Sequence, residues 1–195
     1  MAAEIFAILS GLILVAGAPP YLIDILKHKT KPERATWFIW SVLGTIAFIS
    51  QLSLHGGWSL LFVGLDGLGS IIVFLLSLKY GVGGWTWLDR IALIIAAAGV
   101  VISLVAHSPT LALCGVVLAD ISGVVLTIRK TFLDPGSETT ITWFFVGTSA
   151  LLGALSVGKV QFDLLLYPVY LTIGNYGVLT AKYLGLALGR RTAAD

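Results

Sequence analysis

Three polar residues interrupt long apolar stretches of this chain, and their chemical types could bind a solute or carry a proton. Asp66 stands in GLDGLGS, Asp120 in the run after Pro109, and Asn175 in IGNYG. A charged side chain costs about 3 kcal/mol at the centre of a membrane helix, so such groups generally face a cavity or a partner. We expect Asn175 to orient a solute, and Asp66 or Asp120 to bind a cation or a proton. A purely structural role, as hydrogen-bonded groups of a buried core, stays open for all three.

Aromatic residues near these positions are further candidates for the same site. Trp40 lies one helical turn deeper than Trp37, which is expected at a membrane interface together with Trp143. Tyr170 and Tyr176 flank the middle of the last apolar stretch. These three inner aromatic side chains, Trp40, Tyr170 and Tyr176, either contact a solute or pack in the core.

Prolines inside two of the apolar stretches are candidate hinges. Pro19 and Pro20 remove backbone donors from the first stretch, and Pro168 does so in the last. Weak points of this kind act as hinges in many transporters. A permanent bend without motion is the alternative.

The composition places these residues in a membrane protein. The chain has 195 residues, of which 57% are hydrophobic and 11% charged, and its mean hydropathy is +0.98. A soluble domain carries about 25% charged residues, so this chain has too little polar surface to face water. We expect an integral protein of a bacterial or archaeal inner (plasma) membrane, with lipids as partners and no nucleic acid.

No arrangement of residues for covalent or metal chemistry is evident. The single cysteine, Cys114, excludes an intramolecular disulfide and a thiolate metal site. His28, His55 and His107 fall at the ends of apolar stretches, and their spacing indicates no metal site. A nucleophile with its base and a phosphate-binding loop are also missing. We therefore predict no enzyme activity, no cofactor and no metal.

Charge clusters divide the chain into seven apolar segments. Most of them approach the ~20 residues that cross ~30 Å of hydrocarbon, and their continuous apolar character favours helices over barrel strands. The fourth and sixth are slightly short. The predicted helices are Ile5–Ile25, Thr36–Leu54, Trp58–Leu78, Ile91–Ala106, Pro109–Ile128, Thr140–Val157 and Leu164–Leu188.

Lysine and arginine gather on one side of these predicted spans. The opposite side holds Lys159, and Lys182 lies near the inner end of the last segment. By the positive-inside rule the N-terminus lies outside and the C-terminus in the cytoplasm, which requires an odd number of spans. The residues on the cytoplasmic side are Lys27, Lys29, Lys31, Arg34, Lys79, Arg90, Arg129, Lys130, Arg190 and Arg191.

The stretch Gly17–Gly44 has a weaker copy at Ser122–Ser149, displaced by 106 positions. Later in each half, Lys79-Tyr80 resembles Lys182-Tyr183, and we interpret both lysines as anchors at the membrane boundary. Such a duplication indicates a repeat architecture. The pairs in the first stretch are Pro20 with Leu126, Thr36 with Thr142, Trp37 with Trp143 and Phe38 with Phe144.

The duplication predicts an all-α membrane protein of the 3+1+3 type. Two three-helix bundles, residues 1–80 and 108–195, run parallel, and a linker of residues 81–107 with the fourth helix joins them. The odd helix is needed because a second unit of three helices would otherwise enter from the wrong side.

In these features the chain resembles the PQ-loop superfamily, which includes the SWEET sugar transporters, their half-size bacterial relatives and the lysosomal amino-acid exporters. The first half has Pro20-Tyr21 before the basic turn Lys27–Lys31, and the second has Leu126-Thr127 before Arg129-Lys130. Neither half has the Pro-Gln pair. Prolines that the sugar transporters carry in helices two and six are also absent, and the nearest flexible positions are Gly44 and Gly147.

The resemblance implies a carrier with a central pocket between the two bundles. SWEET-type proteins bring one asparagine each from helices three and seven to that pocket. Asn175 matches the second of these, whereas the equivalent position in helix three is Ile72, so Asp66 is the expected substitute.

We therefore predict a carrier for a small polar solute such as a sugar, an amino acid or a vitamin precursor, by facilitated diffusion or proton coupling. One alternative is a receptor or scaffold on the same fold, which binds without transport. Another is a seven-helix retinal protein with Lys182 as Schiff-base lysine, which the matching Lys79 argues against. One chain contains both halves, so a monomer suffices, and a homo-oligomer stays open.

Overall fold

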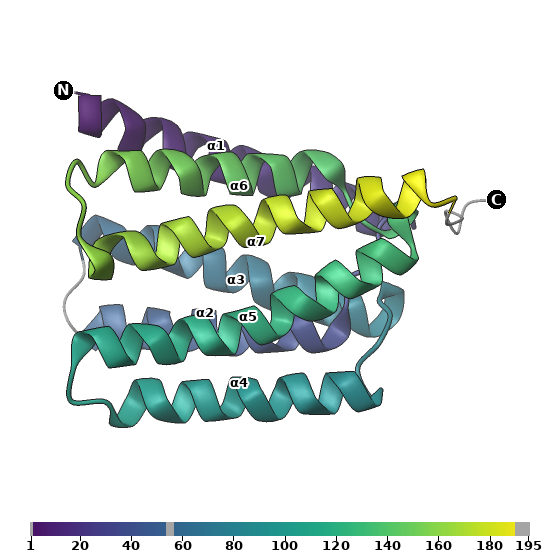
Figure 1. Cartoon of the computed structure of the whole chain (residues 1–195), viewed down its shortest axis with the longest axis horizontal. Helices are drawn as coiled ribbons and strands as arrows, with labels where there is room; N and C mark the ends of the chain where they lie inside the picture. The colour runs from purple at the N-terminus through teal and green to yellow at the C-terminus, as the bar shows by residue number, and fades with distance from the viewer. Residues whose placement is uncertain (1, 54–56, 190–195) are drawn as a thin grey trace. The chain divides into compact units, whose positions relative to one another are not determined.

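The computed structural model describes residues 2–53 and 57–189, which fold into seven α-helices and one short 3-10 helix (Figure 1). The predicted all-α class is therefore confirmed. Within these ranges the one extended pairing is an isolated parallel bridge between Glu33 and Val82. The helices are α1 (Ala2–Leu26), α2 (Arg34–Ser53), α3 (Gly57–Tyr80), α4 (Trp87–Val105), α5 (Pro109–Leu133), η1 (Pro135–Ser137), α6 (Thr140–Ser156) and α7 (Phe162–Ala187).

Most helix ends lie within four residues of the predicted ones. The exception is α5, which ends at Leu133 rather than at the predicted Ile128. The basic character of Arg129 and Lys130 predicts a solvated turn at these residues. Lys130 instead pairs with Glu138 inside the fold, so the helix continues past it.

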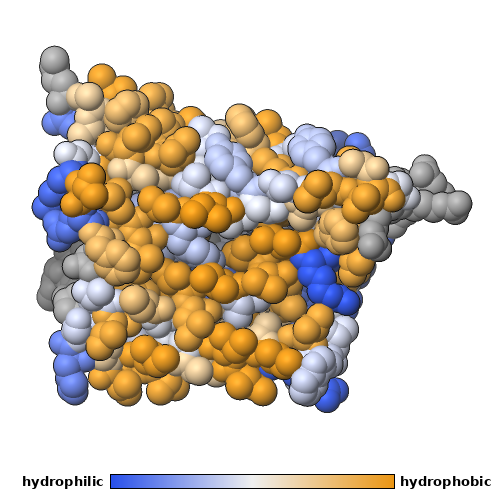
Figure 2. All heavy atoms as spheres, viewed as in Figure 1, coloured by the Kyte–Doolittle hydropathy of each residue, from blue (hydrophilic) through white to orange (hydrophobic). Residues whose placement is uncertain are grey.

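Four helices, α1, α4, α5 and α7, are long and apolar enough to cross a membrane by length and composition. Large apolar side chains are widely exposed on them: Ile8 is 63% exposed, Leu12 64% and Ile94 69%. Figure 2 shows hydrophobic residues along the flanks of the helices and hydrophilic residues near their ends. Such a distribution is unfavourable in water and suits lipid. The remaining helices contain shorter apolar stretches.

One compact unit comprises Met1–Thr30 and Ile128–Asp195. In this unit α1 packs along α6, and α6 also packs against α7. Hydroxyl groups join α1 to α6. Ser10 Oγ donates to the carbonyl of Ser149 at 2.8 Å, and Thr142 Oγ1 donates to the carbonyl of Gly17 at 2.8 Å.

The other compact unit comprises Lys31–Thr127, and in it α2 packs against α3 and α4. The backbones of α2 and α3 meet at Gly44 and Gly67, where a Cβ on Gly44 would lie 2.8 Å from the Gly67 Cα. Gly44 is thus a position of close helix packing. Thr36 Oγ1, at the start of α2, donates to the carbonyl of Gly123 in α5 at 2.7 Å.

These units group the helices differently from the predicted bundles of residues 1–80 and 108–195. Helix α1 lies in a unit with α6 and α7, whereas α2 and α3 lie in a unit with α4. The predicted linker, residues 81–107, contains α4, which packs against α2. The bundles follow the sequence repeat and the units follow packing, so helices that are neighbours in one repeat divide between the two units.

Candidate functional site

Asn175 lies on α7 and is buried, with 6% of its surface exposed. Its Nδ2 donates to the carbonyl of Leu171 at 2.7 Å, which is the one hydrogen bond that its side chain makes to described residues. The side-chain carbonyl oxygen is therefore available to a donor from a ligand. A buried amide with spare acceptor capacity suits the predicted role of orienting a polar solute.

The two tyrosines predicted for the site lie in the same unit as Asn175. Tyr176 shares a hydrogen bond with Thr148 of α6 at 2.9 Å, and its ring would lie 3.0 Å from a Cβ on Gly147. The Cβ of Asn175 would lie 3.3 Å from the same added Cβ, so α6 and α7 pack closely together at Gly147. Tyr170 stacks at an angle against Tyr167, with ring centroids 6.3 Å apart.

Trp40 and Asp120 both belong to the other unit. Asp120, on α5, is 6% exposed. Gly123 follows it by three residues, on the same face of the helix, and a Cβ on Gly123 would lie 3.3 Å from Nε1 of Trp40. Trp40 also packs edge-on against Trp37, with centroids 4.9 Å apart. The structure thus brings the Trp40 indole to the α5 face that carries Asp120.

Asp66 and the three prolines that are predicted as hinges all lie inside helices. Asp66 lies in α3, but its side chain falls outside the described side chains. Helix α1 runs without a break through Pro19 and Pro20, and α7 runs through Pro168. Their role as hinges stays a prediction.

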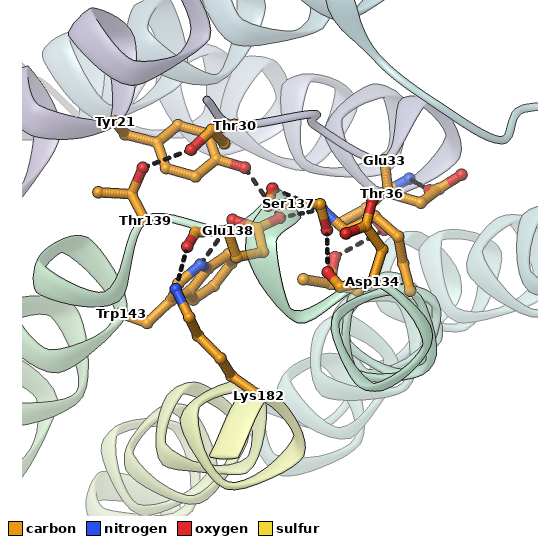
Figure 3. Close-up of polar contacts among 12 residues, drawn as sticks. Tyr21, Thr30, Glu33, Thr36, Asp134, Ser137, Glu138, Thr139, Trp143 and Lys182 are labelled. Atoms are coloured by element: carbon orange, nitrogen blue, oxygen red, sulfur yellow. Dashed lines mark hydrogen bonds and ion pairs between the residues drawn. The ribbon is translucent and has the colours of Figure 1, made fainter. Parts of the chain in front are cut away.

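A buried ionic cluster that the sequence did not predict surrounds Glu138, just before α6 (Figure 3). Glu138 is 2% exposed. One carboxylate oxygen pairs with Nζ of Lys130 and accepts from Tyr21 at 3.2 Å. The other accepts from Nε1 of Trp143 at 2.7 Å, and Nζ of Lys182 donates to the main-chain carbonyl at 2.6 Å. This carboxylate is fully satisfied.

The Glu138 cluster corrects two expectations from the sequence. Trp143 is 5% exposed and bonded to Glu138, so it is a core residue and not an interface anchor. Lys182 is also bonded inside the fold, whereas Lys79 is exposed and lies over the ring of Tyr80 at 5.1 Å. The two lysines are thus not equivalent anchors. The sequence alone does not show that Lys182 lies beside Glu138, so it does not distinguish the two lysines.

A second buried glutamate, Glu33, stands just before α2 and is 3% exposed. Its Oε2 accepts from the amide of Thr36 at 2.7 Å (Figure 3), which caps α2. Asp89, 4% exposed, is close enough to act on it electrostatically. Burial raises the pKa of Glu33, Asp89 raises it further, and the amide hydrogen bond from Thr36 lowers it.

Asp89 is held in place by the start of α4. Its Oδ2 accepts from the amides of Gly84 and Thr86 at 2.7 and 2.8 Å, and Thr86 Oγ1 accepts from the amide of Asp89 at 3.3 Å. This reciprocal pair is a capping box. The carboxylate is therefore fixed beside the α3–α4 loop.

The sequence carries one signal that could have found both glutamates. Each copy of the repeat has a glutamate shortly before its Thr-Trp pair: Glu33 before Thr36-Trp37, and Glu138 before Thr142-Trp143. The two are one position out of register at the displacement of 106, so matching identical positions misses them.

Comparisons with family models, with curated proteins and with solved structures give no match. Within the described residues no three His, Cys, Asp or Glu side chains are grouped so that they could hold a metal ion. The arrangement offers buried hydrogen-bonding groups and carboxyls in apolar helices. Groups of these types in apolar helices can bind polar solutes and protons.

Proposed function

We propose that the chain is a membrane carrier for a small polar solute, built as two parallel three-helix repeats joined by α4, with its N-terminus outside. The solute is a sugar, an amino acid or a vitamin precursor. A plan of PQ-loop or SWEET type accommodates the seven helices, their order and the four long apolar spans. Internal repeats are a common basis of carriers, since two similar halves can exchange roles during alternating access.

One pair of equivalent hydrogen bonds carries this proposal. Thr36 Oγ1 donates to the carbonyl of Gly123 at 2.7 Å, and Thr142 Oγ1 donates to the carbonyl of Gly17 at 2.8 Å. The displacement of 106 that relates the two threonines also relates Gly17 to Gly123. Each unit thus makes the same contact from opposite copies of the repeat. This equivalence supports a duplicated, functionally paired architecture.

In the proposed carrier Asn175 orients the solute through its amide. Tyr176 and Tyr170 lie in the same unit, and Trp40 and Asp120 in the other. Asp120, as a buried carboxyl on an apolar helix, is the candidate for a coupling proton or cation, together with Asp66 on α3. An aromatic face and a carboxyl suit sugars and amines alike.

Uptake by the purified full chain in proteoliposomes tests the proposal. Labelled sugars, amino acids and vitamin precursors are screened by counterflow at two pH values. For the transported solute, Asn175→Ala is expected to lower uptake by about tenfold or more, because it removes a buried ligand group. Thr180→Ala is the matched control. Thr180 also donates to a carbonyl four residues earlier on α7, at 2.8 Å, but it is exposed.

Uptake by the control is expected within about twofold of the wild type. Saturable binding without counterflow of any of the solutes would overturn the carrier and favour a receptor. Equal loss in Asn175→Ala and Thr180→Ala would show that Asn175 has no special part in the path.

A further inference from the structure

The backbone around Glu33 is fixed on both sides, so its carboxyl has a defined environment. The amide of Val82 donates to the carbonyl of Pro32 at 2.9 Å, and the amide of Arg34 donates to the carbonyl of Val82 at 2.9 Å. These bonds form the isolated parallel bridge between Glu33 and Val82. The loop before α2 is thereby attached to the loop after α3, and we call this part of the chain, residues 31–36 with 81–89, the Glu33 corner.

The two carboxyl oxygens of Glu33 are used differently. Oε2 accepts from the amide of Thr36. Oε1 is buried and has no hydrogen-bond partner among the described residues. It is directed at Gly83, where φ is +72° and an added Cβ would overlap Oε1. A buried, unpartnered carboxylate oxygen is costly because it loses its water without gaining a donor.

The charges around the carboxyl do not neutralise it. Arg34, which follows it, donates from Nε to the carbonyl of Ser77 and from Nη1 to the carbonyl of Gly83, both at 2.9 Å. No ion pair reaches Glu33 within the described part of the chain, and Asp89 adds a like charge. The other titratable groups on the loop and on the helices of this unit are Lys31, Asp66, Lys79, Tyr80, Arg90, Cys114 and Asp120, of which Lys79, Arg90 and Cys114 are exposed.

Apolar residues follow Glu33 closely in the chain. Ala35, two residues later, belongs to a buried cluster with Ala92 of α4 and Leu126 of α5. Such surroundings strengthen the repulsion between two carboxylates and weaken solvation of either. The amide and the hydroxyl of Thr36 and the amide of Ala35 act in the opposite direction and lower the pKa of Glu33. Of these, the amide of Thr36 donates to Oε2.

We propose that Glu33 is a proton-binding site, in which Oε1 holds a proton while Oε2 caps α2. A neutral carboxyl removes the repulsion with Asp89 and the need for a donor at Oε1. Release of the proton would leave two buried carboxylates in one corner and weaken the contact between the loops before α2 and after α3. Proton binding thus sets how firmly this corner is closed. The raised pKa of Glu33 agrees with this geometry.

Infrared difference spectroscopy of the purified full chain in lipid bilayers tests the site directly. The wild type is expected to keep a carbonyl band of a protonated carboxyl above pH 4.5, where an ordinary glutamate is ionised, and Glu33→Gln is expected to lose that band. Glu138→Gln is the control, because its carboxylate is paired with Lys130. An identical band in the wild type and in Glu33→Gln at every pH above 4.5, the ordinary pKa of glutamate, would overturn the proposal.

A second variant keeps the test decisive if Glu33→Gln does not fold. Asp89→Asn retains the oxygen that accepts from Gly84 and Thr86 and removes the like charge. The band of Glu33 is then expected to disappear at a lower pH than in the wild type, and an unchanged midpoint would count against the site.

Sodium distinguishes a proton from another cation. Loss of the band on replacing choline by sodium at constant pH would show a metal cation at Oε1 and overturn the assignment. All these readouts are made without solute, so they succeed or fail independently of the proposed transport.

Discussion

Glu33 and Glu138 each stand shortly before a Thr-Trp pair of the sequence, and their surroundings in the structure are opposite in kind. Glu138 receives an ammonium, a phenol and an indole donor. Glu33 receives one backbone amide and faces a second carboxyl. Both are almost fully buried, so exposure does not explain the difference. The hydrogen bonds and the ion pair of Glu138 stabilise the contact between its neighbours. The unpartnered carboxyl oxygen of Glu33 makes that residue a titratable site.

The difference lies in what surrounds the acid, not in the helix contact beside it. Both copies retain the threonine that donates to a glycine carbonyl, so the helix contact is common to the two. The copies differ in what surrounds the acid. Lys130 and Lys182 reach Glu138 from α5 and α7, whereas the arginine next to Glu33 is used on two carbonyls.

The largest expected effect is in the Glu138 cluster. Lys130→Met leaves a buried carboxylate without its cation, which typically costs about 3–5 kcal/mol. Lys79→Met is the matched control on an exposed lysine and is expected to change stability by about 0.5 kcal/mol or less. Denaturant unfolding in detergent micelles measures both. Similar free energies of unfolding for the two variants would show that the Glu138 cluster does not stabilise the fold.

A smaller effect is expected at Gly83 in the Glu33 corner. Gly83→Ala adds a Cβ that overlaps Oε1 of Glu33 and forces alanine to φ +72°, for a cost of about 2 kcal/mol. In a Glu33→Ala background the overlap is gone, so only the backbone cost of about 1 kcal/mol is expected. A double-mutant cycle on unfolding free energies measures this coupling. Strict additivity would contradict the contact.

The smallest effects test what the two copies share. Thr36→Val and Thr142→Val each remove one hydrogen bond to a glycine carbonyl, worth about 1 kcal/mol. Thr36 also accepts from Thr127 at 3.1 Å, so Thr36→Val is expected to cost the more of the two. The double variant is expected to be additive within about 0.5 kcal/mol, because the two threonines share no partner. Thermal unfolding of the wild type, the two single variants and the double variant measures this. A loss of stability in only one of the single variants would mean that the two contacts are not equivalent.

The helices themselves could be predicted because apolar composition and charge clusters define them. Seven segments, their order and most of their ends follow from these two features. The end of α5 could not be predicted, because it depends on a partner for Lys130 that lies eight residues later in the chain. From the sequence alone a basic residue is expected in solvent, because its acidic partner is not evident there.

The candidate site was only partly accessible from the sequence. Burial of Asn175 and Asp120 agrees with their mid-helix positions. Both glutamates were missed because they lie in short polar loops, where acids are normally solvated. Burial of Glu33 depends on the bridge to Val82, a long-range contact that no local pattern indicates.

The pH dependence of stability tests the contrast between the corners most directly. The folded-state pKa of Glu33 is raised above its usual value of 4.5, so the folded protein holds a proton that the unfolded chain releases. Its contribution to stability is therefore complete below pH 4.5 and is lost as the pH rises through the folded pKa. Unfolding free energies of the wild type and of Glu33→Gln are measured from about pH 4 to about pH 9. The account predicts that the wild type loses stability relative to Glu33→Gln as the pH rises. A constant difference, or a wild type that gains on the variant, would contradict it.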